Sequence, residues 1–410
     1  MQEEDQTSKV PKPGGLTILK VIADAHPPDA RLQKEINTLE GAGHTVHVAC
    51  WDRVAQDSLP AFCAGELGNV YRLKKTSPRG HSIRFGFNLF AFYRYVIGIA
   101  RRVQPDVLHV HSVQALPVGV VLRETRHLPL VYDAHEVTEM FGRGISPVIG
   151  RVLWFLERGV LRYVDLLITV SEGLRERYVK EVRPGVECIA LLNCLSVPQD
   201  PAPRKLPGTP LVLGRIGTLR PRSRIDMIAD IVVALNESGT PVRFKYAGES
   251  RGRYAATVAD SQERMAEFTH FVGWVSVDNF EGFYADVDVL LNIHERGDPL
   301  VERLGYFSKV FEAMAFGVPA VINDYPSMTP IITGADSGTV VSDFSIDGFV
   351  QAIRALAEDP QRVLEMGKNA HAVGFQHYNW DVMGERLVEA YRGLARRCDA
   401  GRTGSSGGED

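Results

Sequence analysis

Short runs of β-branched and apolar residues alternate with longer amphipathic segments along the first half of the chain. This alternation is typical of βα units whose strands pair in parallel sheets and are buried on both faces. The pattern predicts strands at Thr17–Ala23, Val46–Ala49, Val107–Val110, Leu130–Asp133 and Leu166–Val170, with helices most clearly at Arg31–Ala42 and Ser171–Val179.

The second half repeats the same alternation. It predicts strands at Leu211–Ile216, Arg243–Ala247, Thr269–Phe271, Val287–Asn292, Pro319–Asn323 and Thr339–Val341, and helices that include Arg224–Ser238 and Ser308–Phe316. Five prolines interrupt regular structure between the halves, at positions 198, 201, 203, 207 and 210. The sequence therefore predicts an α/β protein of two doubly wound domains, 14–197 and 211–378, joined by a linker at 198–210.

The C-terminal part contains one more amphipathic helix, predicted at 379–397. Its apolar positions fall on one stripe, which needs a surface to cover it: Trp380, Met383, Leu387, Tyr391 and Leu394. Residues 398–410 are rich in Gly, Ser and charged residues, so we expect a disordered tail.

Composition excludes several classes of protein. The 46 Lys and Arg against 50 Asp and Glu give a net charge of −4, which argues against a chain whose whole surface binds nucleic acid. Five cysteines without a CxxC spacing indicate neither a disulfide framework nor a zinc site. The polar N-terminus has no apolar run behind it, and charged residues interrupt every long apolar stretch. We expect a cytoplasmic protein.

Glu312 is a carboxylate within an otherwise apolar helix turn, ahead of a glycine turn at Gly317 and a buried strand. Burying such a group without hydrogen bonds costs several kcal/mol, as an order of magnitude. A ligand with paired hydroxyl groups would supply those bonds. Alternatively, Glu312 lies on the solvent-exposed side of the helix and only caps the helix or pairs with Lys309.

Polar residues follow two strands of the first half. His109 and His111 lie on one face of their strand, and His111 stands at its carboxyl end. The next strand ends in Asp133, His135 and Glu136, at the same edge of the sheet. Two successive strands that end in this way favour a site over structural histidines, although a carboxylate there can also cap the following helix.

A basic turn follows the first strand of the second half. It contains Gly217 and four arginines, among them Arg222 and Arg224. Arginine suits a diphosphate because its planar guanidinium group can donate two parallel hydrogen bonds to phosphate oxygens. The alternative is a solvated basic turn. Gly248, at the next strand end, would permit close approach of a ligand to the backbone, and Glu295 follows a later strand at the same edge.

The segment 84–102 is aromatic and basic. It predicts either an amphipathic helix that touches a membrane surface or, as the more common case, a helix that faces the core.

Together these residues resemble the retaining glycosyltransferases of family 4, which have the GT-B fold. The resemblance extends from about Leu16 to Leu394. It rests chiefly on the segments 309–319, 105–111 with Leu116 and Pro117, 132–136, and 29–31 with 41–46.

The resemblance implies that the second domain binds a nucleotide-diphosphate sugar as co-substrate, with no metal and no other cofactor. Glu312 would bind the ribose hydroxyls, and the remaining donor-binding residues would be Gly217, Ser308, Lys309, Gly248 and Glu295. His111 would lie near the transferred sugar, Arg222 and Arg224 would assist catalysis at the diphosphate, and the first domain would bind the acceptor through Arg31, His135 and Glu136. The last helix would cross back to the first domain. The leaving diphosphate would itself help to deprotonate the acceptor hydroxyl.

The chain departs from the family pattern in three respects. A second glutamate usually precedes the one at Glu312 by eight residues, where this chain has Leu304; Glu295 or Glu302 could replace it. The usual Arg and Lys of the phosphate turn fall on Thr218 and Ser223, and residues 25–29 replace a glycine-rich loop.

The first hypothesis is therefore a retaining glycosyltransferase. Its acceptor would be a small molecule, a lipid-linked sugar or a polysaccharide precursor, with possible peripheral contact to a membrane and no nucleic-acid partner. The alternatives are a catalytically weak protein that binds nucleotide sugars or a partner transferase, and a sugar-nucleotide epimerase of the same fold.

Overall fold

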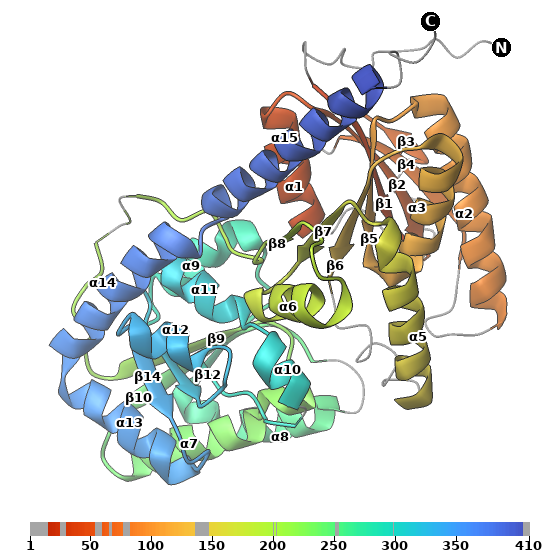
Figure 1. Ribbon diagram of the computed structural model, residues 1–410. Helices are drawn as coiled ribbons and strands as arrows, with labels where there is room; N and C mark the ends of the chain where they lie inside the picture. Colours follow the sequence, from red (N-terminus) through yellow and green to blue (C-terminus); the bar gives the residue numbers. More distant parts are fainter. Residues whose placement is uncertain are drawn as a thin grey trace, which may run out of the picture. The chain divides into compact units, whose positions relative to one another are not determined.

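The computed structural model of the chain describes residues 15–24, 30–53, 60–64, 68–76, 83–135, 147–199, 201, 203–250, 254–297 and 299–404. The chain divides into two compact units (Figure 1). Unit 1 comprises residues up to Leu191 together with those from Met383 onward, and unit 2 runs from Leu192 to Val382.

Unit 1 contains an eight-stranded sheet in the order β3-β4-β2-β1-β5-β6-β7-β8, parallel except where β3 pairs with β4. Its strands are β1 Thr17–Ile22, β2 Thr45–Asp52, β3 Phe62–Cys63, β4 Asn69–Lys74, β5 Val107–His111, β6 Leu130–Ala134, β7 Leu166–Thr169 and β8 Cys188–Ala190. Its helices are α1 Ala30–Gly41, α2 Ile83–Val103, α3 Ser112–Arg126, α5 Pro147–Val160 and α6 Glu172–Arg177. The five strands predicted for this half are present; the polar β4 and the very short β3 and β8 were missed.

Unit 2 contains a six-stranded parallel sheet in the order β11-β10-β9-β12-β13-β14. Its strands are β9 Leu211–Ile216, β10 Val242–Ala247, β11 Thr269–Gly273, β12 Val289–Asn292, β13 Ala320–Asn323 and β14 Gly338–Val341. Its helices are α7 Ile225–Glu237, α8 Ala255–Arg264, α9 Phe280–Tyr284, α10 Pro299–Leu304, α11 Ser308–Ala315, α12 Thr329–Gly334, α13 Ile346–Glu358 and α14 Pro360–His377. All six predicted strands are present.

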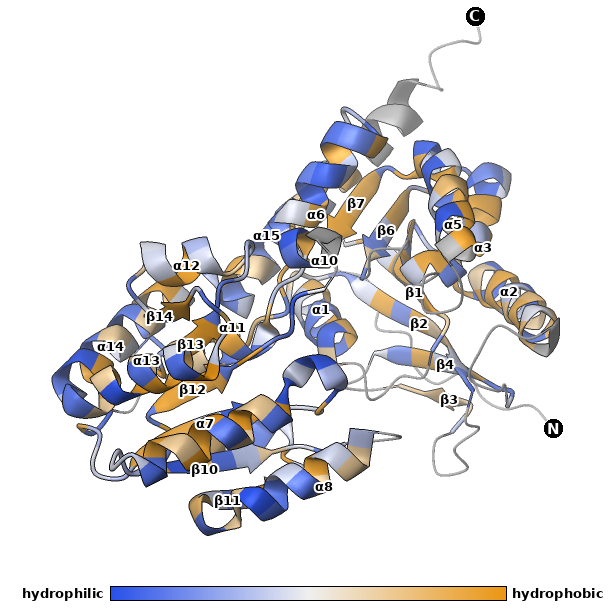
Figure 2. Cartoon of the chain, turned by 90° about the horizontal axis from the view of Figure 1, so that it is seen from below, coloured by the Kyte–Doolittle hydropathy of each residue, from blue (hydrophilic) through white to orange (hydrophobic). Residues whose placement is uncertain are grey.

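The strand order of unit 2 reverses direction between β9 and β12, its two central strands. In doubly wound sheets, ligands bind beyond the carboxyl ends of the strands at such a switch point. Both strands are mostly apolar and largely buried, as expected for parallel strands covered on both faces. Figure 2 shows β12 in the colour of hydrophobic residues. The topology thus directs attention to the loops after Ile216 and Asn292.

Helix α15 spans Trp380–Gly404 and begins in unit 2. From Met383 onward it packs with unit 1, where Leu387, Tyr391 and Leu394 are buried. Gly384 lies against Thr38 of α1, and a Cβ at this glycine would come within 3.2 Å of the threonine Cγ2. The helix continues past its predicted end, so residues 398–404 are helical rather than disordered; residues 405–410 lie outside the described part.

Within the described part of the chain, no helix has both the length and the apolar character that are needed to cross a membrane.

Candidate functional site

A cavity of about 640 Å³ opens in unit 2 beyond the carboxyl ends of β9 and β12 and ahead of α11. Its lining consists of the residues Arg215, Ile216, Gly217, Thr218, Arg220, Pro221, Arg222, Ser223, Asn292, His294, Tyr306, Phe307, Ser308 and Lys309. Four of these side chains are cationic and none is acidic. The cavity therefore attracts an anion.

Gly217 forms part of the wall of this cavity, whereas Gly248, also predicted to bind the donor, is absent from the lining and lies against Gly217. Gly217 has a φ of 118° and Gly248 a φ of 145°, a region that side chains disfavour. A Cβ on Gly217 would lie 2.9 Å from Cε of Lys309, and a Cβ on Gly248 would overlap the carbonyl oxygen of Gly217. The backbone N–H of Gly217 donates to the carbonyl of Ala247 at 2.8 Å. The absence of side chains thus lets the two loops touch and leaves room for Lys309.

Arg215 is the deepest cation of the cavity, with 7% of its surface exposed. Its Nη1 makes only long contacts, 3.4 Å to Oδ1 of Asn292 and 3.5 Å to the carbonyl of Leu291. Burial lowers the pKa of this guanidinium to about 10, so it stays charged at neutral pH. Nδ2 of the neighbouring Asn292 has no hydrogen-bond partner among the described residues. A ligand could satisfy both groups.

His294 adds a neutral polar group to the lining. Burial, together with the charges of Arg215 and Arg222, lowers the pKa of its imidazole to about 4. Its ring packs on Phe307, with 4.9 Å between the ring centroids. At neutral pH, His294 therefore offers one donor and one acceptor, a combination that suits a hydroxyl group.

Glu312 is buried on α11, with 7% of its surface exposed. Lys309 Nζ donates to both of its carboxylate oxygens, at 2.9 and 3.0 Å. The alternative that places Glu312 on the solvent-exposed side of the helix is therefore wrong, whereas the pairing of Glu312 with Lys309 is confirmed. Lys309 lines the cavity and Glu312 stands behind it.

The two arginines predicted for catalysis have different surroundings. Arg222 lines the cavity. Arg224 does not: its guanidinium donates to Asp226 at 2.9 to 3.1 Å and lies 3.7 Å from Glu295. Glu295 is also absent from the lining, so the structure separates this predicted donor-binding residue from Ser308, Lys309 and Gly217.

Glu302, the other replacement considered for the missing glutamate, has a local role. It accepts from Arg296 Nε at 2.9 Å and from the backbone N–H of Gly297 at 2.7 Å. Leu304 is buried. Thus Glu302 fixes the loop after β12, and neither it nor Glu295 brings a carboxylate to the cavity wall.

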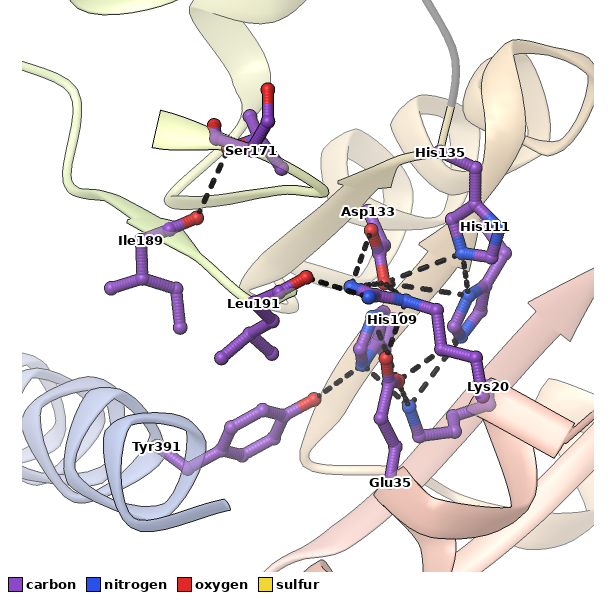
Figure 3. A network of polar contacts seen from close by, with 12 residues as sticks. Lys20, Glu35, His109, His111, Asp133, His135, Ser171, Ile189, Leu191 and Tyr391 are labelled. Carbon is purple, nitrogen blue, oxygen red and sulfur yellow. Dashed lines mark hydrogen bonds and ion pairs between the residues drawn. The ribbon is translucent and has the colours of Figure 1, made fainter. Parts of the chain in front are cut away.

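The predicted residues of the first half meet in a second polar cluster, inside unit 1 (Figure 3). Lys20 of β1 lies at its centre. Its Nζ donates to Glu35 Oε2 of α1 at 2.5 Å and lies 3.0 Å from His109 Nδ1 and 3.4 Å from His111 Nε2. His109 also contacts the hydroxyl of Tyr391 on α15, at 2.8 Å. All five side chains are fully buried.

A second row of contacts leads from this cluster to the surface. His111 Nδ1 lies 2.9 Å from His135 Nε2, and His135 in turn lies 3.3 Å from Asp133 Oδ2. The side chain of His135 is 20% exposed, whereas His111 has no exposed surface. Of the two histidines, only His135 offers surface to a ligand in this conformation, and the predicted catalytic role of His111 stays a prediction.

Arg31 binds protein groups on all sides. It pairs with Asp133 at 3.0 Å and with Glu35 at 3.1 Å, and it donates to the carbonyl of Leu191 at 2.7 Å. It is 5% exposed, and the acceptor-binding role predicted for it stays a prediction. Glu136, the third predicted acceptor-binding residue, lies outside the described residues.

Burial and pairing set the protonation of this cluster. Burial raises the pKa of Asp133, but Arg31 and His135 outweigh it and hold that pKa well below its usual value. For His135 burial lowers the pKa, and the charge and hydrogen bond of Asp133 more than compensate, so its pKa is raised. Burial lowers the pKa of His111 well below its usual value. His111 is therefore neutral, whereas its neighbour His135 is more readily protonated than an ordinary histidine.

Glu35, His109, His111 and Asp133 form the one group of potential metal ligands found among the described residues, with donor atoms within 4.8 Å of one another. Lys20 Nζ already lies among these atoms, and Arg31 adds a second positive charge. The two cations face the two carboxylates, while burial lowers the pKa of Lys20 and raises the pKa of Glu35. We interpret the group as an ion cluster centred on Lys20.

Sequence reasoning missed Lys20 and Glu35. The available signal was a lysine in the middle of an apolar strand, at a position where both faces of the sheet are covered. Its partner comes from α1 and could not be named from sequence, because the pairing depends on how α1 packs on the sheet.

Two family models match the chain. Residues 29–193 match the glycosyl transferase 4-like domain, and residues 210–359 match the glycosyl transferases group 1.

Two relatives illustrate the range of similarity. A D-inositol 3-phosphate glycosyltransferase of Kribbella flavida is 23% identical over 317 residues, 70% of this chain and 71% of that protein. A GDP-mannose-dependent alpha-(1-6)-phosphatidylinositol monomannoside mannosyltransferase of Mycolicibacterium smegmatis is 27% identical over 222 residues, 54% of this chain and 50% of that protein.

Solved structures agree with the fold. Sucrose-phosphate synthase from Thermosynechococcus elongatus superposes with a TM-score of 0.73 at 14% identity, over 92% of this chain and 99% of that one. HepE of Anabaena, in complex with UDP-glucose, gives a TM-score of 0.67 at 15% identity, over 92% and 100% of the two chains. The fold is GT-B, with two Rossmann-like domains.

Proposed function

Because the chain belongs to glycosyltransferase family 4, we propose that it transfers a sugar from a nucleotide-diphosphate sugar to an acceptor hydroxyl with retention of the anomeric configuration. The observation that carries the donor assignment is the cavity of unit 2. Among the described residues, its lining contains four cationic side chains and no carboxylate, at the switch point of a parallel sheet.

The diphosphate would lie against Arg222 and Lys309, near the backbone of Gly217 and Ser308. These groups would stabilise the negative charge that develops on the leaving diphosphate as the bond to the sugar breaks. Arginine and lysine that already face a shared cavity need little reorganisation for this role. Arg215 would add positive charge from beneath.

Glu312 would bind the ribose hydroxyls. Each carboxylate oxygen has two lone pairs, so the two bonds from Lys309 leave capacity for further donors. The same lysine would then connect ribose and diphosphate binding. Since Glu295 and Glu302 are held by Arg224 and Arg296, recognition of the ribose would rest on Glu312 without a second carboxylate.

The acceptor is a glycan, a lipid-linked sugar or a small molecule in this proposal. The similarity to a D-inositol 3-phosphate glycosyltransferase and to a phosphatidylinositol monomannoside mannosyltransferase supports acceptors with several hydroxyl groups. His135 would contact the acceptor side, since it is the exposed end of the cluster in unit 1. A cytoplasmic location remains a prediction.

The first test measures donor binding and turnover together. Candidate UDP- and GDP-sugars are screened by thermal shift, because a ligand that binds the folded state raises its apparent stability. Release of nucleoside diphosphate is then measured with an acceptor pool, and the anomeric configuration of the product is read by NMR. Binding without any turnover would contradict the proposal in favour of a binding protein, and isomerised donor without acceptor would favour an epimerase.

The second test uses variants. Glu312→Ala is expected to raise the donor Michaelis constant about tenfold or more, because a charge-assisted hydrogen bond contributes about 1.5–3 kcal/mol. Glu295→Ala is the matched control, because this carboxylate is 46% exposed and lies near Arg224 rather than Lys309, and it is expected to change the constant by less than about twofold. Equal effects of the two variants would refute the assignment of Glu312.

A further inference from the structure

Helix α5 of unit 1 turns an apolar stripe outward. Val148, Val152, Phe155 and Leu156 follow the spacing of one helix face and are exposed, with 75% of Phe155 accessible. On the opposite face of α5, Trp154 is buried within unit 1. A soluble helix normally buries its apolar stripe, so this second stripe requires an explanation.

Helix α2 presents a similar face. Phe85 and Phe92 are buried, and both stack near Trp51 of β2. Phe87 and Phe90 point outward, with 73% of Phe87 exposed. The aromatic segment predicted to face either the core or a membrane is therefore divided between a core face and an exposed face.

The two helices belong to one layer. Helix α3 packs against both α2 and α5, and Figure 1 shows the three helices along the same part of unit 1. We call the exposed residues Phe87, Phe90, Val148, Val152, Phe155 and Leu156 the outer face of unit 1.

Charge distinguishes this outer face from the rest of the molecule. Helix α2 has no acidic residue, and the single one of α5, Glu157, is buried and accepts hydrogen bonds from Tyr132 and Tyr178. Among the side chains that the structure describes on the two helices, the exposed cations are Arg94, Arg101, Arg102, Arg151 and Arg158. On α3 the exposed Glu124 is paired with Arg123 at 3.2 Å. A chain of net charge −4 thus concentrates positive charge around its exposed apolar residues.

We propose that the outer face of unit 1 binds the surface of an anionic lipid bilayer. Aromatic and aliphatic side chains would enter the boundary between headgroups and acyl chains, and the arginines would bind the anionic headgroups. A second copy of this chain is a poorer occupant, because a symmetric contact would bring two sets of arginines together without acidic partners. The proposal does not depend on the proposed sugar transfer.

Co-sedimentation of the full chain with vesicles tests the proposal. We expect binding to vesicles of phosphatidylcholine with 30% phosphatidylglycerol, as a probe composition of roughly physiological charge. Binding to phosphatidylcholine alone is expected to be at least about tenfold weaker, and added salt should weaken the anionic binding further. Equal binding to the two compositions would overturn the proposal.

Variants locate the binding surface. Phe155→Ser combined with Leu156→Ser is expected to reduce the partition coefficient about tenfold, because two apolar side chains no longer enter the bilayer. Trp274→Ser is the matched control, since Trp274 is 71% exposed but belongs to unit 2. Arg94→Glu with Arg151→Glu should reduce binding to anionic vesicles, and Arg243→Glu, at an exposed position of β10 in unit 2, should not.

Circular dichroism and nucleotide binding verify that each variant is folded and that unit 2 is intact. Unchanged vesicle binding by the double variants of the outer face would overturn the proposal. So would a concentration-dependent dimer of the parent protein, measured by light scattering, that the Phe155 and Leu156 substitutions abolish.

Discussion

The polar cluster of unit 1 and the cavity of unit 2 arrange their charges in opposite ways. In unit 1, Lys20 and Arg31 face Glu35 and Asp133, and the four charges neutralise one another. In unit 2, Arg215 and Arg222 face a cavity without a carboxylate in its lining. Balanced charges hold a fold together, whereas unbalanced charges around an open volume are available to a ligand.

The same contrast occurs within unit 2. Arg222 and Arg224 are separated by one residue, yet only Arg222 lines the cavity. Arg224 has a left-handed backbone, with a φ of 45°, and its guanidinium donates hydrogen bonds to the carboxylate of Asp226. The local backbone therefore decides which arginine is free to bind an anion.

The largest expected effect comes from removing the central cation of unit 1. Lys20→Met leaves Glu35 buried without its closest partner and should destabilise the protein by about 3–5 kcal/mol. Urea unfolding at pH 7 measures this change. Lys180→Met, which breaks an exposed pair with Glu176, is the control and should cost less than about 1 kcal/mol.

A double variant separates charge balance from packing. Lys20→Met with Glu35→Leu removes both charges and should recover part of the lost stability, because no unpaired carboxylate remains. If Lys20→Met were no more harmful than Lys180→Met, the interpretation of the cluster as a set of balanced ions would be wrong.

The next effect concerns the two arginines of unit 2. Arg222→Ala should weaken binding of a nucleoside diphosphate about 10- to 100-fold, because a charge-assisted hydrogen bond to phosphate is lost. Arg224→Ala, the matched control, should weaken it less than about threefold, since its guanidinium is bound by Asp226. Calorimetric titration measures both. A larger loss for Arg224→Ala would reverse the assignment.

A smaller effect is a pH dependence in unit 1. The pKa of His135 is raised in the folded state, so protonation of His135 stabilises the fold. This stabilisation is fully present below the pKa of the unfolded state, about 6.5, and is lost as the pH rises through the raised pKa of the folded state. His135→Asn should therefore destabilise the protein by about 1 kcal/mol more at pH 6 than at pH 9.

Unfolding titrations at a series of pH values measure this difference. His127→Asn is the control, because His127 is exposed and its left-handed backbone accepts asparagine. A difference between parent and His135→Asn that does not change between pH 6 and 9 would show that His135 carries no such proton.

The smallest effect is a shift of His294. NMR titration should find its imidazole neutral above about pH 5, since its pKa is about 4. Arg222→Ala should raise that pKa by a fraction of a unit by removing a nearby positive charge, and a bound nucleoside diphosphate should raise it further. A pKa that is unchanged by the nucleotide would place the diphosphate away from Arg222.

The sequence alone determined the six strands of unit 2, five of the eight strands of unit 1, and the apolar setting of Glu312 on α11. Periodic burial, glycine and proline turns mark the strands of unit 2 locally, and Glu312 is conspicuous because its apolar neighbours are adjacent in sequence. The stripe on α15 was equally visible. These features are local, so a pattern of neighbouring residues suffices to predict them.

Only the tertiary structure decided how the charges are paired. Lys20 meets Glu35 and His109 because α1 packs beside a parallel sheet that brings β1 and β5 together. Likewise, Arg222 lines the cavity and Arg224 does not because one residue adopts a left-handed backbone. Electrostatic energy depends on distances of a few ångström between segments far apart in sequence, and the fold alone sets those distances.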